Sequence, residues 1–443
     1  MSEELEIDDL APGGEGVARH SGRPVFVPFA APGDRLEVDV PPGEGAAHAT
    51  WTRIVRAGPD RIDAPCPHFG PGPGEDRLCG GCAWLHLRYE RQLHEKERGL
   101  VEALRRIGRL EPGSYPLRPI VPSPDPLRYR SRAKFHVDRA GERLVFFRRR
   151  SHEPVRLASC HLLEPGLDQL REAFGPALAR ARLRPPEVAL EWSTHAGRGA
   201  ALLRGIDAGE GTRRRCQELL ADLPVLAGLV LEGDGDGRRG RPITSVGDPV
   251  LLHERVPGDP ASGLARSRPD VFQQANRGAN ARLVAAALAL LRPEGEDVLE
   301  LFCGTGNFTG PVAAGARSVS AIEGQGPAIE LARTDLAGGN VRFFAGEALT
   351  IASALAREGR RFGAVLLDPP RDGMKGTGPL LRDLAPPRVV YVSCDPATLA
   401  RDLKGAVAAG YRVAAVQPVD MFPQTHHVEA VVLLERGDGE GCS

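Results

Sequence analysis

The stretch Glu300-Leu-Phe-Cys-Gly-Thr-Gly-Asn-Phe-Thr-Gly310 decides the fold of the C-terminal part of the chain. It follows a strand-like run and precedes a helical pattern, and Gly304 and Gly306 let the backbone turn tightly beneath a ligand. A dinucleotide fingerprint has a third glycine where this chain has Thr309. Glu323 ends the next strand, where a carboxylate can accept hydrogen bonds from both ribose hydroxyls. This pattern indicates a nucleoside-containing cofactor, NAD or S-adenosylmethionine, with a ligand-free turn as the alternative.

Strands and helices alternate on both sides of this stretch. We expect helices at 277–291, 326–337, 349–358, 377–384 and 396–408, and strands at 298–302, 318–323, 341–346, 364–370, 389–394, 411–418 and 428–434. This alternation predicts an α/β domain with a doubly wound, mostly parallel sheet. Ligands of such sheets bind at the carboxyl ends of the strands.

Three side chains with catalytic potential lie at these expected strand ends. Asp368 is followed by two prolines, which make a rigid strand end without backbone donors of its own. Cys394 lies where a nucleophile would be placed, although a lone cysteine is more often structural. Glu429 enters the last strand and could serve as a base or as an ordinary ion-paired carboxylate.

The composition is that of a globular protein with several domains. The chain has 443 residues, of which 42% are hydrophobic, 26% charged and 5% aromatic, so we expect roughly three domains. It has no apolar run of membrane-spanning length, and its first residues do not resemble a signal peptide. These features predict a cytoplasmic protein that is not inserted in a membrane.

The net charge of -1 hides a basic middle region. Residues 1–60 have five basic and eleven acidic residues, residues 61–263 have 33 and 27, and residues 264–443 have 19 and 20. The excess concentrates in 128–156, with ten basic residues against three acidic ones. Such a stripe indicates a polyanionic partner or a solvated arginine-rich face.

The N-terminal region combines a small β domain with a cysteine-rich segment. Residues 5–57 read as closely spaced short strands, which predicts a small barrel. Cys66, Cys79 and Cys82 follow in a segment with little expected regular structure, and Cys160 lies further on. Four thiolates suit either zinc or a [4Fe–4S] cluster, and their spacing does not choose between them.

Five motifs together resemble the RNA 5-methyluridine methyltransferases. They are Phe272-Gln-Gln-Ala-Asn276, Glu300-Leu-Phe-Cys-Gly-Thr-Gly-Asn-Phe-Thr309, Asp368-Pro-Pro-Arg371, Ser393-Cys-Asp395 and His427-Val-Glu429. With the barrel and the cysteines, the chain is most similar to the bacterial 23S ribosomal RNA uracil-C5 methyltransferases. These enzymes have a TRAM domain and an iron–sulfur cluster. The similarity covers nearly the whole chain, in order.

The resemblance implies a role for each matching residue. Cys394 would add to C6 of uracil, and Glu429 would remove the proton from C5. S-adenosylmethionine would contact Gln274, Phe302, Asn307, Glu323, Glu347 and Asp368. Cys66, Cys79, Cys82 and Cys160 would bind a [4Fe–4S] cluster, although the interval between the first two is longer than in most relatives.

The resemblance also predicts the domains and the partner. We expect a TRAM-like barrel at 1–58, a mixed α+β RNA-binding domain with the iron–sulfur segment at 59–264, and a class I, Rossmann-like methyltransferase domain at 265–443. A helix near 88–109 is expected to pack on the catalytic domain. The partner would be 23S ribosomal RNA, bound by a monomer, with the target base turned out of its helix.

Three other functions stay open at this point. A transfer RNA T-loop uracil methyltransferase would use the same chemistry. An RNA-binding protein without catalytic activity is disfavoured by the presence of Cys394, Glu429 and Gln274. A nicotinamide oxidoreductase is disfavoured by the missing third glycine. Phe135, Phe146 and Phe147 are candidates for stacking on RNA bases, with packing in a strand core as the alternative.

Overall fold

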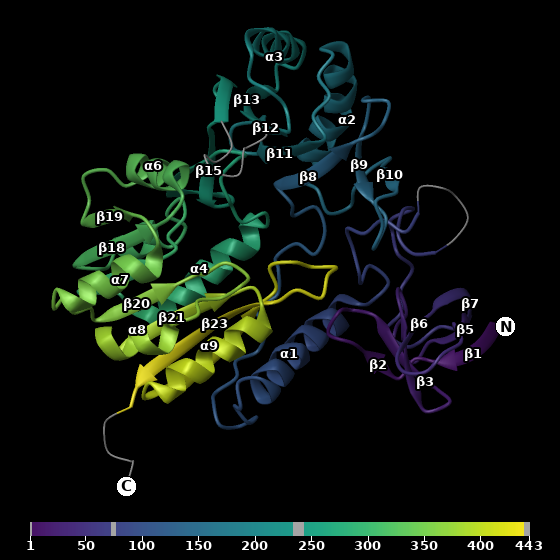
Figure 1. Cartoon of the computed structure of the whole chain (residues 1–443), viewed down its shortest axis with the longest axis horizontal. Coiled ribbons are helices and arrows are strands. Elements are labelled where there is room, and N and C mark those ends of the chain that lie inside the picture. The colour runs from purple at the N-terminus through teal and green to yellow at the C-terminus, as the bar shows by residue number, and fades with distance from the viewer. Residues whose placement is uncertain (1, 72–76, 234–242, 438–443) are drawn as a thin grey trace.

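The computed structural model describes residues 2–71, 77–233 and 243–437, and three lobes are visible in it (Figure 1). The N-terminal lobe is the small β domain, the second lobe is a mixed α/β unit, and the C-terminal lobe has the cofactor turn. Part of the insertion between Cys66 and Cys79, and the loop expected at 234–242, lie outside the described residues. Within the described residues, no helix is long and apolar enough to cross a membrane.

The N-terminal lobe is a β-barrel of short strands. Its strands are β1 (Ser2–Glu6), β2 (Asp9–Leu10), β3 (Gly16–His20), β4 (Arg23–Val27), β5 (Arg35–Asp39), β6 (Ala47–His48) and β7 (Thr50–Arg56). They pair in the orders β1-β5-β7 and β2-β3-β4-β6 and enclose a small apolar core that includes Ile7, Val25 and Leu36. The polar residues between these core positions face outward, as the alternating sequence requires.

The middle lobe is a seven-stranded sheet with two helices on one face. Its strands are β8 (Arg132–Val137), β9 (Leu144–Phe147), β10 (Pro154–Arg156), β11 (Glu187–Ser193), β12 (Arg198–Arg204), β13 (Leu226–Glu232) and β14 (Ile243–Gly247), in the order β10-β9-β8-β11-β12-β13-β14. The helices α2 (Pro165–Arg180) and α3 (Glu210–Asp222) bury the apolar core against this sheet. A hairpin of β15 (Leu251–Val256) and β16 (Asp259–Ser267) leads to the C-terminal lobe.

The C-terminal lobe is a Rossmann-like, doubly wound α/β fold. Its strands are β17 (Asp297–Leu301), β18 (Ser318–Glu323), β19 (Val341–Ala345), β20 (Ala364–Leu367), β21 (Arg388–Ser393), β22 (Tyr411–Val419) and β23 (Glu429–Arg436). Their order is β19-β18-β17-β20-β21-β23-β22, and only β23 runs antiparallel to its neighbours. The strand order reverses beside β17, and ligands bind at such a switch point in open α/β sheets.

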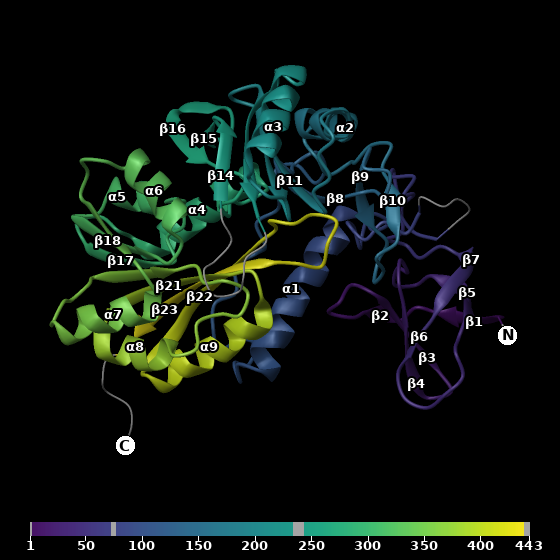
Figure 2. The ribbon, with the colours of Figure 1, turned by 45° about the horizontal axis from the view of Figure 1, so that its top comes forward.

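Helices cover both faces of this sheet (Figure 2). One face packs against α4 (Arg277–Leu291) and the short α5 (Thr309–Ala313). The other packs against α7 (Ala348–Arg357), α8 (Thr377–Leu384) and α9 (Pro396–Ala408), whereas α6 (Gly326–Asp335) lies near β16. The buried strands read as nearly continuous apolar runs because both faces are covered.

A helix from the N-terminal half joins this outer layer. It is α1 (Tyr89–Arg106), which lies beside α9 and buries Leu100 and Leu104 in the core of the C-terminal lobe (Figures 1 and 2). The ammonium group of Lys96 is fully buried and lies 2.5 Å from Oδ1 of Asp420, which follows β22. Tyr89 donates a hydrogen bond to the other oxygen of Asp420, at 2.8 Å. The helix is thus held by a buried ion pair as well as by apolar contacts.

Replacing Lys96 by methionine is expected to destabilise the protein strongly. Asp420 would remain buried without its cation, and breaking such a pair costs about 3–5 kcal/mol of unfolding free energy. Urea denaturation followed by circular dichroism measures this change. The exposed Arg106 of the same helix, changed to alanine, is the control and should leave the midpoint nearly unchanged. The double variant Lys96→Met/Asp420→Asn should recover part of the loss, and an unchanged Lys96→Met protein would contradict this account.

Candidate active site

The turn after β17 is built from backbone in the left-handed region. Phe302, Gly304 and Gly306 have φ angles of 63°, 55° and 89°. The carboxylate of Glu323, at the end of β18, accepts hydrogen bonds from the backbone N–H groups of Gly304, at 2.9 Å, and Gln325, at 2.7 Å. Glu323 therefore supports the turn from the next strand. Left-handed backbone at a non-glycine residue such as Phe302 is uncommon and occurs most often at functional sites.

Two of the other expected cofactor residues share a cavity beside this turn. The cavity is lined by Gln274 and Asn307, together with Asn280, Arg277 and Thr305. Asn307 and Asn280 exchange two amide hydrogen bonds, at 2.8 and 3.0 Å. This pairing fixes both amides and holds the start of α5 against α4.

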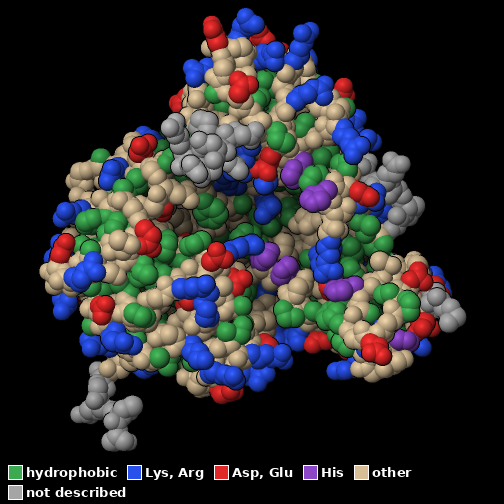
Figure 3. Space-filling model, viewed as in Figure 1, with side chains coloured by type: hydrophobic (Ala, Val, Ile, Leu, Met, Phe, Trp, Pro, Cys, Tyr) green, Lys and Arg blue, Asp and Glu red, His purple; other side chains and the backbone are tan. Residues whose placement is uncertain are grey.

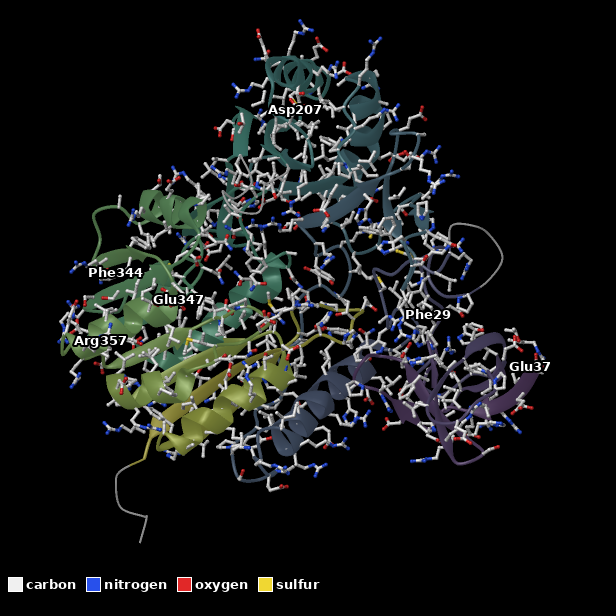
Figure 4. The ribbon with its side chains drawn as sticks, in the orientation of Figure 1. Phe29, Glu37, Asp207, Phe344, Glu347 and Arg357 are labelled. Carbon is white, nitrogen blue, oxygen red and sulfur yellow. The ribbon has the colours of Figure 1, made fainter. Side chains whose placement is uncertain are left out.

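Glu347 has a different local setting. It precedes α7, and its carboxylate accepts hydrogen bonds from the backbone N–H groups of Leu349, at 3.0 Å, and Thr350, at 2.6 Å. It thus caps the helix, and its pKa is lowered by the Thr350 side chain first and by these two backbone hydrogen bonds as well. Figure 4 labels it close to Phe344, at the edge of the lobe formed by β19 and α7. Glu347 is therefore a structural cap whatever else it contacts.

Several buried acidic side chains surround the end of β17. Glu300 is fully buried, and neither of its carboxyl oxygens has a hydrogen-bond partner among the described residues. Burial raises the pKa of Glu300 to about 8; the neighbouring Thr309 hydroxyl acts in the opposite direction, and the nearby Asp368 and Glu323 raise the pKa further. Burial also raises the pKa of Asp368 to about 7. A site with this many poorly solvated carboxyl groups suits a positively charged ligand.

The register of the sheet brings Cys394 and Glu429 to the same end. Ser393, the last residue of β21, pairs with Ala430 of β23. Because β23 runs antiparallel, its first residue Glu429 lies beside Cys394, which directly follows β21. Glu429 is buried, and its Oε2 atom has no hydrogen-bond partner among the described residues.

The charges in this site act on one another. Burial raises the pKa of Glu429 well above its usual value, Asp368 raises it further, and Arg371 lowers it. Burial raises the pKa of the Cys394 thiol to about 11; Glu429 and Asp368 add to this, and Arg371 opposes it. These four side chains therefore form one electrostatically coupled group. Without a ligand, the thiol of Cys394 is protonated at neutral pH.

The four candidate metal cysteines also come together. Cys66, Cys79, Cys82 and Cys160 line one cavity between the cysteine segment and the middle lobe, with largely apolar neighbours. Burial raises the pKa of all four thiols, to about 11 for Cys79. Across residues 2–71, 77–233 and 243–437, no three His, Cys, Asp or Glu side chains are placed to hold a metal ion.

The aromatic candidates for RNA stacking divide into two groups. Phe135 is fully buried and stacks on Phe146, with ring centroids 5.0 Å apart. Phe146 lines the cysteine cavity. Core packing, one of the two interpretations left open for these aromatics, holds for Phe135, and the half-buried Phe146 packs against the same core. Phe147 is half-buried and stacks on His136 at 3.9 Å.

The arginine-rich stretch is partly used within the protein. Arg132 donates hydrogen bonds to the carbonyl groups of Val271 and Pro269, and so holds the segment before Gln274. Arg150 donates a hydrogen bond to Glu15 of the barrel, and Arg149 forms an ion pair with the same carboxylate. Figure 3 shows Lys, Arg and His side chains around the hollow where the lobes meet. Arg149 and Arg150 of the stripe therefore join the middle lobe to the barrel.

Sequence reasoning missed three contributors to the site. Glu300 belongs to the motif of the turn but had no expected role of its own. A charged residue inside an apolar strand is itself a signal of function or of ion pairing. Arg371 had no assigned charge role, and Asn280 gave no signal at all because its partner Asn307 lies 27 residues away. Only the assembled fold brings these groups to the turn.

Two family models match the chain. The model described as tRNA (Uracil-5-)-methyltransferase matches residues 262–437, and the TRAM domain model matches residues 3–41. A 23S rRNA (uracil(1939)-C(5))-methyltransferase RlmD from Alkalilimnicola ehrlichii is 37% identical, over 98% of this chain and 96% of the relative. The chain belongs to the RNA uracil-C5 methyltransferases.

Other members of this methyltransferase family agree over the full length. The RlmD protein of Pectobacterium atrosepticum is 33% identical, over 98% of this chain and 94% of the relative. The structure of Pyrococcus abyssi tRNA (uracil-54, C5)-methyltransferase with S-adenosyl-L-homocysteine is 23% identical and has a TM-score of 0.74, covering 97% of this chain and 99% of that one. The predicted fold class and the dependence on S-adenosylmethionine are confirmed.

The buried carboxyl of Glu300 gives a testable pH dependence of stability. Between pH 5.5 and 8 the folded protein keeps a proton on Glu300 that the unfolded chain has released, so the unfolding free energy falls as pH rises. The neutral variant Glu300→Gln should reduce this fall by on the order of 3 kcal/mol. Urea denaturation of the ligand-free methyltransferase at both pH values measures it. The exposed Glu294, changed to glutamine, should leave the fall unchanged; an equal fall in Glu300→Gln would refute the assignment.

Proposed function

We propose that this methyltransferase methylates C5 of a specific uridine in 23S ribosomal RNA. The relatives named for that reaction at uracil 1939 match 98% of this chain with 33–37% identity. The observation that carries the chemistry is the pairing of β21 with β23, which brings a thiol and a buried carboxyl to the cofactor turn. We expect the enzyme to act in the cytoplasm as a monomer.

C5 of uracil is a poor nucleophile, so the reaction needs a protein nucleophile that activates it. The Cys394 thiolate adds to C6, which gives an enolate whose C5 carries negative charge and accepts the methyl group. The Glu429 carboxylate then removes the proton from C5. The electron pair of that C–H bond restores the C5–C6 double bond, and the bond between C6 and sulfur breaks to release the thiolate. A base with a raised pKa, as Glu429 has, takes this proton more readily.

S-adenosylmethionine supplies the methyl group, carried on a sulfonium. The residues proposed to hold it are those around the turn: Gln274, Phe302, Asn307, Glu323, Glu347 and Asp368. The unpartnered oxygens of Glu300 and the poorly solvated Asp368 fit the positive charges of this cofactor. A cation among these carboxyl groups favours their ionised forms.

The RNA must present its uracil outside a helix. The hollow between the lobes has a rim with basic side chains, which suits a phosphate backbone (Figure 3). The half-buried pair of Phe147 and His136 offers an aromatic surface at the middle lobe, of the kind on which unpaired RNA bases stack. A flipped or loop uridine could then reach Cys394.

We also propose a [4Fe–4S] cluster at the four cysteines. The support is that four free thiols line one apolar cavity and match the ligand set of such a cluster. All four side chains would bind as thiolates, and their raised pKa values mean that binding releases protons.

Two alternative functions follow from the same site. A transfer RNA substrate is supported by the similarity to the family model named for tRNA and uses identical chemistry. A protein that only binds RNA would not need Cys394 and Glu429 side by side. The RNA that receives a labelled methyl group distinguishes these alternatives.

Methyl transfer from labelled S-adenosylmethionine tests the proposed function. With total RNA from a strain that lacks the enzyme, we expect the label as 5-methyluridine at one position of 23S ribosomal RNA. Cys394→Ser should lower the rate at least about 10³-fold, since the nucleophile is lost, and should still bind RNA. Label in transfer RNA would overturn the substrate, and full activity of Cys394→Ser would overturn the mechanism.

Metal analysis tests the cluster. The full-length protein purified without oxygen should contain iron and acid-labile sulfide in equal amounts, and Cys82→Ala should lose most of both. The buried Cys216, which lies in the core of the middle lobe, is the matched control, and Cys216→Ala should keep them. Stoichiometric zinc with no sulfide would show that the cluster proposal is wrong.

A further inference from the structure

The segment that leads to Glu429 is held from outside its own lobe. This segment, residues 420–427, connects β22 to β23 and ends two residues before Glu429. Its first residue is Asp420, paired with the buried Lys96 of α1. Lys96 also donates a hydrogen bond to the carbonyl group of Phe422, at 2.9 Å. One ammonium group therefore fixes two positions of the segment.

Gln424 is the most heavily bonded residue of the segment. Its backbone N–H donates to the side-chain oxygen of Gln92, and the Gln92 amide donates to the side-chain oxygen of Gln424, both at 2.9 Å. Its carbonyl group accepts hydrogen bonds from the backbone N–H groups of Ala83, at 2.9 Å, and Trp84, at 3.0 Å. Ala83 directly follows Cys82, so the cysteine segment and α1 hold the same residue.

The backbone of Gln424 explains why so many contacts are needed. Its φ angle is 68°, in the left-handed region that a glutamine seldom adopts. Such a conformation persists only where the surroundings over-determine it. Gln92 is itself buried and is fixed by further hydrogen bonds to the carbonyl groups of Trp84 and Leu87. The helix thus imposes a turn that the segment would not keep by itself.

We propose that Gln92 is a positioning residue for the base: it fixes residues 420–427 and, through them, the carboxyl group of Glu429. This inference rests on the proposed role of Glu429 in taking the C5 proton. Cys394 lies on the other strand, β21, and does not depend on the segment for its position. Loss of Gln92 therefore slows proton removal and leaves addition to C6 and methyl transfer largely intact. The C6–sulfur bond then stays unbroken, and the methylated RNA remains attached to Cys394.

A denaturing gel detects this attached RNA directly. Wild-type protein, Gln92→Ala and the control Leu100→Ala are each incubated with labelled substrate RNA and S-adenosylmethionine. Leu100 is fully buried on the same helix, but its apolar side chain makes no hydrogen bond, so its loss lowers the melting temperature while the hydrogen bonds of Gln424 remain. We expect Gln92→Ala to accumulate the protein–RNA adduct and to lose about 10- to 100-fold in kcat, with KM for RNA unchanged. Leu100→Ala should accumulate none.

Two further variants make the outcome decisive. Gln92→Glu keeps an acceptor for the Gln424 N–H but loses the donor to the Gln424 side chain, so it should trap an intermediate amount of adduct, and it replaces Gln92→Ala if that protein does not fold. Glu429→Gln should trap adduct irrespective of Gln92. Two outcomes would overturn the inference while adduct in Glu429→Gln still supports the role of Glu429 as the base. One is turnover at the wild-type rate by both Gln92 variants, and the other is an equal amount of adduct in Leu100→Ala. Absence of adduct in Glu429→Gln would instead overturn the base and, with it, the inference.

Discussion

A buried ammonium group joins two parts of this chain that are far apart in the sequence. Lys96 and Asp420 are separated by more than 300 residues, and both side chains are fully buried where they meet. A charge removed from water requires a partner at close range, so the pair holds α1 in its position beside α9. That position places the cysteine segment, which directly precedes α1, next to the connection that leads to Glu429. The barrel is linked to the same region, since Trp84 donates a hydrogen bond to the carbonyl group of Gly14.

The carboxyl groups of the active site lack a compensating positive charge when no ligand is bound. Glu300 and Glu429 are buried and Asp368 is half-buried, and the charge of Asp368 adds to the effect of burial on the pKa values of Glu300 and Glu429. Such groups titrate together, and in the ligand-free protein some of them hold protons. A cationic cofactor replaces those protons as the source of positive charge. Burial, to which Glu429 and Asp368 add, keeps the Cys394 thiol protonated without a ligand, and the same carboxyl groups provide the means of recognising the cation.

Local pattern predicted most of the catalytic lobe but not its contacts. The helix at 277–291 and the strand at 318–323 have the predicted bounds, because apolar periodicity and turn residues act over a few positions. For Phe135 and Phe146 the sequence left RNA stacking and core packing both open, because a strand has the same pattern whether its aromatic face meets RNA or a packed core; the structure shows packing. The pairing of Gln92 with Gln424 joins residues 332 positions apart, and no local signal in either segment announces it.

The antiparallel strand β23 makes the proposed chemistry possible. In an all-parallel sheet, a residue at the start of the last strand would lie at the edge opposite the cofactor turn, far from Cys394. Reversal of β23 brings Glu429 to the carboxyl ends of its neighbours, and it also obliges the chain to turn back at that edge through residues 420–427. This turn is held by a helix from another part of the chain. The topology that supplies the carboxyl group therefore also creates the need for a helix that orients it.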